Sequence, residues 1–279
     1  MMSKGINLMI LVTFVFCLFV LSQSVSTAQK MSADEIVAKY YDAFYSQAND
    51  MKAKVNMDLI SKSGKTRNRK MVMLRKDFGD KGNQKYFIYF YEPGDVRRTS
   101  FLVWKYPDTD DERWMYIPSV DLVKKIAAKD KRSSFIGSDF TYEDISGRDV
   151  QSDTHKLLKE ETIKDRDCYV VESLPKEKVE YTKRISWVDK KTFLPIKEEY
   201  YDVQNELYRV FHGDEIADIT SGEGEKAKVY PTVLQRTMEN VKKKHKTVVT
   251  FSDVQYEAGI EDSIFTERFL RKPPTKWIK

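Results

Sequence analysis

The residues from Pro93 to Ile145 read PGDVRRTSFLVWKYPDTDDERWMYIPSVDLVKKIAAKDKRSSFIGSDFTYEDI, and this stretch decides the fold. Two aromatic-rich apolar runs, Ser100–Tyr106 and Arg113–Ile117, flank the turn-forming residues Pro107–Asp111. Such residues break both helices and strands, so the pattern predicts a β-hairpin with a five-residue loop. Both alternating sets of side chains in each run are apolar. Both faces of the sheet should therefore be covered at this point.

A box of small and aromatic residues, FIGSDFTYED, follows the hairpin and opens with a small-residue turn. Ser138 or Asp139 is expected to N-cap a short helix that carries Phe140 and Tyr142. The last three residues of the box, a tyrosine and two acids, fit the cap and a solvated helix face. The box is therefore interpreted as structural.

A strand that ends in W-x-Y-x-P, a basic connector at Lys124–Arg132 and a G-S-D-F-x-Y-E-D box resemble the LolA-like outer-membrane lipoprotein-sorting proteins. The matching residues are Trp114, Tyr116 and Pro118 of the hairpin, then Gly137, Ser138, Asp139, Phe140, Tyr142, Glu143 and Asp144 of the box. The resemblance implies a half-open antiparallel barrel with helices as a lid. It also implies a concave apolar cavity that carries the acyl chains of lipoproteins across the periplasm.

The first residues have the features of a signal peptide. Lys4 supplies a positive start, Leu8–Leu21 is an apolar core, and Ser26–Ala28 is a small-residue cleavage site. Cleavage after Ala28 is expected, which leaves residues 29–279 as one LolA-like domain in the periplasm. The alternatives are an uncleaved anchor, for which the core is short, and acylation of Cys17, which lacks the small preceding residue of a lipoprotein signal.

The exported chain is expected to contain Cys168 as its only cysteine, so an internal disulfide is excluded. Cys168 begins an apolar strand, which favours a buried, inert thiol over a nucleophile. The 48 basic and 43 acidic residues nearly balance, which argues against a nucleic-acid partner.

An amphipathic helix is predicted directly after the cleavage site. Ser32 and Glu35 form a capping box, and apolar residues recur at spacings of three and four as far as Gln47. Tyr40 and Phe44 are the expected contacts between this helix and a cavity. A plain core-facing helix is the alternative.

Strand patterns fill the rest of the chain and predict about eleven strands. They lie at Met51–Ser61, Thr66–Phe78, Gln84–Glu92, Ser100–Tyr106, Arg113–Ile117, His155–Ile163, Cys168–Leu174, Lys183–Val188, Pro195–Tyr201, Leu207–Gly213, Thr232–Asn240 and Thr247–Val254. Their hairpin spacing predicts a mainly β fold: a single curved antiparallel sheet, or half-open β-barrel, with covering helices.

The sequence offers little catalytic chemistry. His155, His212 and His245 have no metal-ligand partner at i+2 or i+4, so neither a metal site nor a cofactor is expected. Ser138, Asp139 and His155 represent a nucleophile, an acid and a base by type, yet there is no G-x-S-x-G elbow. A non-enzymatic protein is the preferred interpretation.

The function predicted from these features is that of a periplasmic carrier of acyl chains. The cavity-lining residues are predicted to be the inward-facing ones of the central strands: Phe87, Tyr89, Phe101, Val103, Trp114 and Tyr116. A carrier must keep a cavity of roughly 300–1,000 Å³ or open one by moving its helix, whereas a dry core would leave no void. Partners implied by the resemblance are an inner-membrane exporter of the resistance-nodulation type and an outer-membrane acceptor. The alternative is a non-catalytic adaptor or accessory protein of such an exporter.

Overall fold

The structure is a computed structural model that describes residues 30–279 with the exception of 80–81 and 108. Residues Met31–Lys279 form one compact unit, which contains every helix and strand that the structure describes. The predicted signal peptide, residues 1–28, lies outside the described residues.

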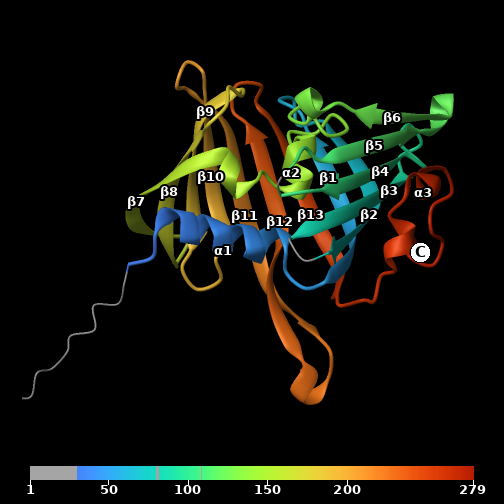
Figure 1. The fold of residues 1–279 in the computed structure, drawn as a ribbon. Coiled ribbons are helices and arrows are strands. Elements are labelled where there is room, and N and C mark those ends of the chain that lie inside the picture. The colour runs from blue at the N-terminus through green and yellow to red at the C-terminus, as the bar shows by residue number, and fades with distance from the viewer. Residues whose placement is uncertain (1–29, 80–81, 108) are drawn as a thin grey trace, which may run out of the picture. The chain divides into compact units, whose positions relative to one another are not determined.

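A single antiparallel sheet makes up most of this unit (Figure 1). In the described part of the chain it has thirteen strands, in the spatial order β6-β5-β4-β3-β2-β1-β13-β12-β11-β10-β9-β8-β7. They are β1 (Asp50–Ile60), β2 (Thr66–Phe78), β3 (Asn83–Glu92), β4 (Ser100–Lys105), β5 (Glu112–Ile117), β6 (Leu122–Ile126), β7 (Asp153–Ile163), β8 (Arg166–Pro175), β9 (Tyr181–Asp189), β10 (Pro195–Asp202), β11 (Leu207–Ser221), β12 (Lys228–Asn240) and β13 (His245–Tyr256). The end strands β6 and β7 do not pair with each other among the described residues, so the sheet is open.

The sheet curves so strongly that strands far apart in its order share one buried cluster. Phe101 of β4, Tyr181 of β9 and Met238 of β12 belong to the same hydrophobic core. These strands meet because the face that carries the three side chains is concave. We call it the concave face, and its opposite the convex face. The predicted curved, half-open antiparallel sheet is confirmed.

Helical segments cover both faces (Figure 1). The helices are α1 (Ala33–Tyr45), α2 (Tyr142–Ser146) and α3 (Glu267–Arg271), and the 3-10 turns are η1 (Pro118–Val120), η2 (Ala128–Asp130), η3 (Val150–Ser152), η4 (Gly224–Lys226) and η5 (Asp262–Ile264). α1 and α2 lie on the concave face, whereas the C-terminal segment with η5 and α3 buries Phe265 and Leu270 against the convex face. The two-sided covering predicted from the apolar runs is confirmed.

α1 forms as its sequence predicts. The Ser32 side chain accepts a hydrogen bond from the backbone N–H of Glu35, and the Glu35 carboxylate accepts one from the backbone N–H of Ser32. This capping box satisfies two of the N–H groups that a helix start leaves unpaired. One side of the helix, with Ile36 and Val37, then packs on Val171 and Val188 of β8 and β9.

The predicted hairpin is present as β4 and β5, with Leu102 opposite Trp114 and Phe101 opposite Met115. The structure adds a strand that the sequence did not reveal. Residues Lys124–Ile126, predicted as part of a basic connector, belong to the edge strand β6. Its two lysines are exposed, so the apolar alternation that marks a strand is weak there.

β11 and β12 continue beyond the rest of the sheet as a two-stranded arm (Figure 1). Residues 215–221 pair with 228–235 of β12, whereas β12 pairs with β13 only from Gln235 onward among the described residues. The arm leaves the sheet at Gly213, where an added Cβ would lie 2.5 Å from the carbonyl oxygen of Pro195. A glycine is therefore required at this crossing.

Candidate functional site

The apolar part of the concave face is the surface on which a ligand-binding function depends. Its core includes Met57 of β1, Met71 of β2, Phe90 of β3 and Phe101 of β4, all nearly inaccessible to solvent. No strand lies over these residues. They are buried instead by α1 and by the box that follows the hairpin, which we call the plug and define as residues 135–145.

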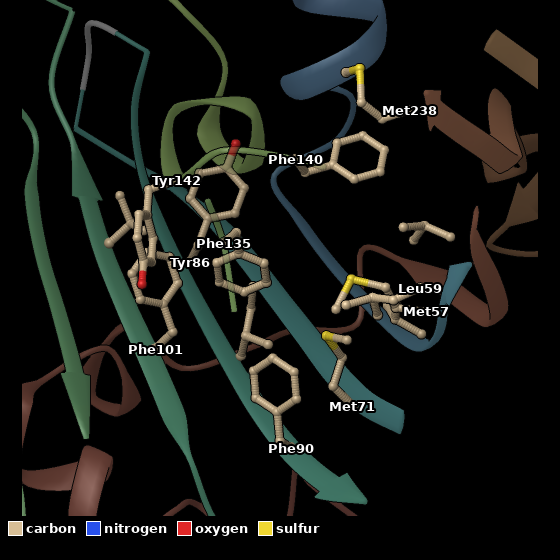
Figure 2. Packing of buried hydrophobic residues seen from close by; sticks show 14 of the residues in the cluster. Met57, Leu59, Met71, Tyr86, Phe90, Phe101, Phe135, Phe140, Tyr142 and Met238 are labelled. Atoms are coloured by element: carbon tan, nitrogen blue, oxygen red, sulfur yellow. The ribbon is translucent and has the colours of Figure 1, made fainter. Parts of the chain in front are cut away.

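The plug places three aromatic rings in the concave interior. The ring centroid of Phe101 lies 5.3 Å from those of Phe135 and Tyr142, and Phe135 and Tyr142 meet edge to face at 5.6 Å. Figure 2 shows both rings lying beside Phe101, with Phe140 directed towards Met238. The plug therefore occupies the space in which the family resemblance expects an acyl chain.

Backbone geometry explains the glycine of the box. Gly137 has a φ of 74°, in the left-handed region that favours glycine. The chain reverses there, so that the backbone N–H of Phe135 donates to the carbonyl of Phe140 at 2.8 Å. The Ser138 hydroxyl donates to the Phe135 carbonyl at 2.7 Å. The turn thus directs Phe135 and Phe140 into the interior.

Two acidic side chains attach the plug to the sheet. Asp139 Oδ2 accepts from the Thr247 hydroxyl at 2.8 Å and lies 2.6 Å from Nδ1 of His245, both on β13. Asp144 Oδ2 accepts from Nη2 of Arg209 on β11 at 2.7 Å. Neither pairing could be predicted from local sequence patterns, because the partners are about a hundred and about sixty-five residues away along the chain.

The helix cap predicted at Ser138 or Asp139 is wrong. α2 begins one turn later, with Thr141 as N-cap and Asp144 at the third helical position in a reciprocal capping box. Ser138 is engaged in the preceding turn instead. The solvated face predicted for the end of the box is also wrong, because Tyr142 and Glu143 are buried. Glu143 lies 3.3 Å from Arg148, which stabilises the buried carboxylate.

The structure does not bring the three candidate catalytic residues together. The ring nitrogens of His155 lie 2.8 Å from the Ser173 hydroxyl and 2.9 Å from the Val150 carbonyl, and Asp139 contacts His245 instead. Cys168 is buried, and burial raises the pKa of its thiol to about 11. The described residues contain no group of three or more His, Cys, Asp or Glu placed to bind a metal.

The predicted lining residues are divided between the two faces. Phe101 and Val103 lie on the concave face. Phe87, Trp114 and Tyr116 belong to the convex cluster beneath the C-terminal segment, and Tyr89 packs against it. The cause is the register of the strands. Leu102 is opposite both Phe87 and Trp114, so these three share a face that Phe101 does not. Contact of Phe101 and Val103 with a ligand stays a prediction.

The two predicted lid residues also differ. Phe44 reaches the concave core, where its ring centroid lies 5.8 Å from that of Phe211. Tyr40 packs at the border of that core, and its hydroxyl donates to the buried carboxylate of Glu198 at 3.2 Å. Glu198 also accepts from Ser186 and Tyr200, at 2.8 and 3.0 Å. The interior is therefore apolar under Phe44 and polar under Tyr40.

Three cavities adjoin the plug. The largest, which we call the mouth cavity, has about 560 Å³ and opens beside Ser138 and Asp139; seven Lys and Arg and four Asp and Glu line it. Two inner cavities of about 50 Å³ each lie deeper. One is lined by Phe44 and Tyr256, the other by residues that include Met71, and Arg236 borders both. Neither of these two inner cavities has room for an acyl chain.

Similarity to known proteins supports the fold and the region of the plug. A family model described as "Uncharacterized protein" matches residues 82–272. A crystal structure of a DUF1329 family protein from Desulfovibrio piger is 29% identical, with a TM-score of 0.77, over 85% of this chain and 97% of that one. No curated protein shows significant sequence similarity to the chain.

Two further crystal structures are similar over most of the chain. A protein described as an outer membrane lipoprotein-sorting protein domain, from Vibrio parahaemolyticus, is 26% identical with a TM-score of 0.74, over 86% of this chain and 98% of that one. A LolA superfamily protein from Nitrosomonas europaea is 21% identical with a TM-score of 0.64, over 86% and 99% of the two chains, and shares the fold. None of the described helices has the length and hydropathy needed to span a membrane.

Proposed function

We propose that the chain, which resembles the LolA-like outer-membrane lipoprotein-sorting proteins in fold and in its motifs, carries acyl chains of lipoproteins or lipids through the periplasm. In this proposal the exported form starts after residue 28, and its concave interior encloses the chains on their way towards the outer membrane. The protein acts by binding and release, without catalysis.

The observation that carries the proposal is that a short segment outside the sheet covers the apolar concave face. The strands are joined to one another by continuous hydrogen-bond ladders. Phe90 and Phe101, in contrast, are covered by the short plug segment, whose side chains bond to the sheet through Asp139 and Asp144. Displacing the plug would expose an apolar surface without breaking a ladder of the sheet. A buried acyl chain would then occupy the space of Phe135, Phe140 and Tyr142.

The free energy gained by burying an acyl chain is of the same order as the free energy lost by exposing the aromatic side chains of the plug. Exposing an acyl chain to water costs about 0.8 kcal/mol per methylene, and fully exposing an apolar side chain such as phenylalanine costs about 1.5–3 kcal/mol. A chain of many methylenes therefore offsets the exposure of three rings. The plug keeps the interior dry without cargo and does not prevent loading.

The second candidate, an adaptor of a membrane exporter, is favoured by the arm. The arm projects from the sheet (Figure 1), and Val229 on it is 55% exposed. A projecting hairpin offers unpaired strand edges to a partner. A carrier must bind an acyl chain in the concave interior, whereas an adaptor need not. The test therefore asks whether the plug has to move for binding.

A disulfide between the plug and β13 tests the proposal. Thr247 Oγ1 lies within 3.0 Å of the backbone nitrogen and the carboxylate of Asp139, so cysteines at these two positions are within reach of a disulfide. We expect the oxidised Asp139→Cys, Thr247→Cys protein to lose binding of a fluorescent fatty acid, and the reduced protein to regain it. Cys168 is buried and will not compete.

The single variants Asp139→Cys and Thr247→Cys are the matched controls, and both should bind in either redox state. Native mass spectrometry of the unmodified protein, purified from its own envelope, should show lipid mass. Equal binding by the oxidised and reduced double variant, with no lipid in the native spectrum, would leave the adaptor function in place of the carrier function.

A further inference from the structure

Arg236 is a cation without an anion. It lies on β12 and borders both inner cavities; its side chain forms no hydrogen bond or ion pair with a described residue, and its Nε is out of contact with solvent. Other interior arginines are paired. Arg209 lies 2.7 Å from Asp144, Arg148 lies 2.8 Å from Asp153, and Arg184 lies 3.7 Å from Glu198.

Arg69 of β2 also lacks a hydrogen bond, but its surroundings differ. The nearby carboxylate of Asp95 raises its pKa and partly offsets the effect of burial. The groups that act most strongly on Arg236 are tyrosines, beginning with Tyr45 and Tyr256. Burial lowers the pKa of Arg236 to about 10, so the guanidinium is still charged at neutral pH.

Two phenylalanines hold the guanidinium. Its central carbon lies 4.7 Å from the ring centroid of Phe44 on α1 and 4.2 Å from that of Phe251 on β13. Cation–π contacts of this kind leave the in-plane N–H donors of an arginine free for a ligand. The contacts fix the position of the charge but do not neutralise it. A partly buried charge without a hydrogen-bonded or ionic partner is costly, so its position calls for a reason beyond stability.

The two inner cavities meet at Arg236 and differ in character. The first is lined by Arg236, by Arg75, which pairs with Asp77, and by the hydroxyl-bearing Tyr45, Thr232 and Tyr256. The Thr232 hydroxyl donates to the Tyr230 carbonyl and is hydrogen-bonded to the Tyr256 hydroxyl. Its volume of about 50 Å³ is enough for a few water molecules or for one small anionic group. The second continues from Arg236 along apolar side chains of the concave face, among them Met57, Met71, Ile88, Phe135 and Val249. Asp144 also lines it, with its carboxylate paired to Arg209 at 2.7 Å.

A cationic end lined by hydroxyl groups and an apolar continuation match an amphiphile with an acidic headgroup. We propose that Arg236 binds the carboxylate or phosphate of an anionic lipid whose acyl chain enters the space of the plug. This inference rests on the proposed carrier function and specifies its cargo. The lipidated cysteine of a lipoprotein carries esters, a thioether and an amide but no anion beside its acyl chains. A requirement for an anion therefore identifies a free acidic lipid.

The guanidinium geometry suits this cargo. An arginine presents parallel N–H donors that match the two oxygens of a carboxylate or phosphate, and such charge-assisted pairs are stronger than neutral hydrogen bonds. Because Phe44 of α1 forms one wall of the site, the headgroup would be bound between the helix and the sheet. Lysine keeps the charge but not the paired donors.

The test compares acidic and neutral ligands on the full exported protein. The ligands are a fluorescent fatty acid, its methyl ester, a lysophosphatidic acid and inorganic phosphate. We expect the acid and the lysophosphatidic acid to bind about 10- to 100-fold more tightly than the ester, the range expected for hydrogen bonds to a charged group. Inorganic phosphate should not displace the fatty acid at millimolar concentration.

The variant Arg236→Met should bind the acid and the ester with equal affinity, close to the affinity of the unmodified protein for the ester. Arg236→Lys should retain part of the preference for the acid. Because Arg236 has no hydrogen-bonded or ionic side-chain partner to lose, and methionine can keep the contacts with Phe44 and Phe251, the melting temperature of Arg236→Met should stay within about 5 °C of the parent. A variant that failed to fold would leave the acid and ester comparison on the native protein, which needs no substitution.

Each other result overturns the inference in a distinguishable way. Equal binding of acid and ester by the unmodified protein would overturn the anion site and leave the carrier function intact. Displacement of the fatty acid by inorganic phosphate would make the site one for a free anion and not for a lipid. Absence of binding by every acyl compound, in native and reduced locked protein alike, would overturn the carrier function and this inference with it.

Discussion

At the scale of single residues, Asp144 combines two roles in the plug. One of its oxygens accepts from the backbone N–H of Thr141, as part of the α2 cap, and from Arg209. Arg209 is 8% exposed, so its charge depends on that carboxylate. Burial by itself lowers the pKa of Arg209, but Asp144 together with Tyr200 and Tyr208 outweighs this effect, and the net shift is upward.

Asp144→Ala should therefore cost much more stability than loss of the cap alone. We expect about 3–5 kcal/mol of unfolding free energy for Asp144→Ala, because an unpaired guanidinium remains buried. Thr141→Ala, the matched control, removes the hydroxyl of the same cap and should cost about 0.5–2 kcal/mol. Urea denaturation of both variants measures the difference. Similar costs would show that Arg209 is stabilised by its contact with Tyr200 and not by Asp144.

Residue-level expectations succeeded where the partners are close in sequence. The capping box of Ser32 and Glu35 spans three residues and was predicted correctly. The cap of α2 was assigned to Ser138 or Asp139 instead of Thr141, although Thr141 and Asp144 show the same spacing. Ser138, Asp139 and Thr141 are all residue types that favour the N-cap position of a helix. The position of the cap depends on contacts with the sheet, in which Asp139 pairs with β13 and Asp144 with β11.

At the scale of elements, the plug and the C-terminal segment cover opposite faces with equally buried phenylalanines. Phe135 of the plug is 2% exposed, and Phe265 on the convex face is fully buried. Either residue changed to alanine should cost about 3–5 kcal/mol of unfolding free energy. Their effects on acyl-chain binding should differ, since only the plug competes with the ligand for space.

Phe135→Ala should bind a fluorescent fatty acid more tightly than the unmodified protein. Weakening the closed state raises the fraction of molecules that are open, and apparent affinity rises with that fraction. Phe265→Ala is the control and should leave the dissociation constant unchanged despite a similar loss of stability. Equilibrium fluorescence titration checks both. Weaker binding by Phe135→Ala would mean that its ring is part of the binding surface and not a competitor.

Strand patterns predicted elements well but could not assign faces where both faces are apolar. Phe101 and Leu102 are both fully buried, one beneath the plug and one beneath the C-terminal segment. Alternation in one strand separates the two sets of side chains. The register of the hairpin decides which side chains of the two strands share a face, and here Trp114 lies opposite Leu102 on the same face. A difference of one residue in register exchanges the faces, and the sequence does not fix it.

At the scale of the whole molecule, the sheet is open, and the strands at its two ends, β6 and β7, have edges that could pair with another chain. The β6 edge exposes Lys124 and Lys125, and β7 exposes several charged residues, so both edges resist pairing with another chain. An open sheet of this curvature was predictable from hairpin spacing and from the family resemblance. The plug was not, because an aromatic segment that fills a concave face has no periodicity that separates it from a loop.

The open sheet and its plug together predict how bound cargo changes the motions of the molecule. Without cargo, amide groups of the plug region are protected: the Phe135 N–H donates to Phe140, and the Glu143 N–H donates to Lys131 at 2.7 Å. If an acyl chain takes the place of the rings, these bonds open while the sheet remains paired. Ligand binding also stabilises the folded state as a whole, by about 2.7 kcal/mol at a ligand concentration one hundred times the dissociation constant.

Hydrogen–deuterium exchange with and without saturating fatty acid should therefore show two opposite changes. Peptides that cover residues 131–146 should exchange faster with ligand, because the plug has left the interior. Peptides from β1 and β13, whose ladder forms the floor of the concave face, should exchange more slowly, because global opening has become rarer. The oxidised disulfide variant should show neither change. Slower exchange in both regions would instead place the acyl chain outside the space of the plug, since a ligand that binds elsewhere stabilises the plug together with the sheet.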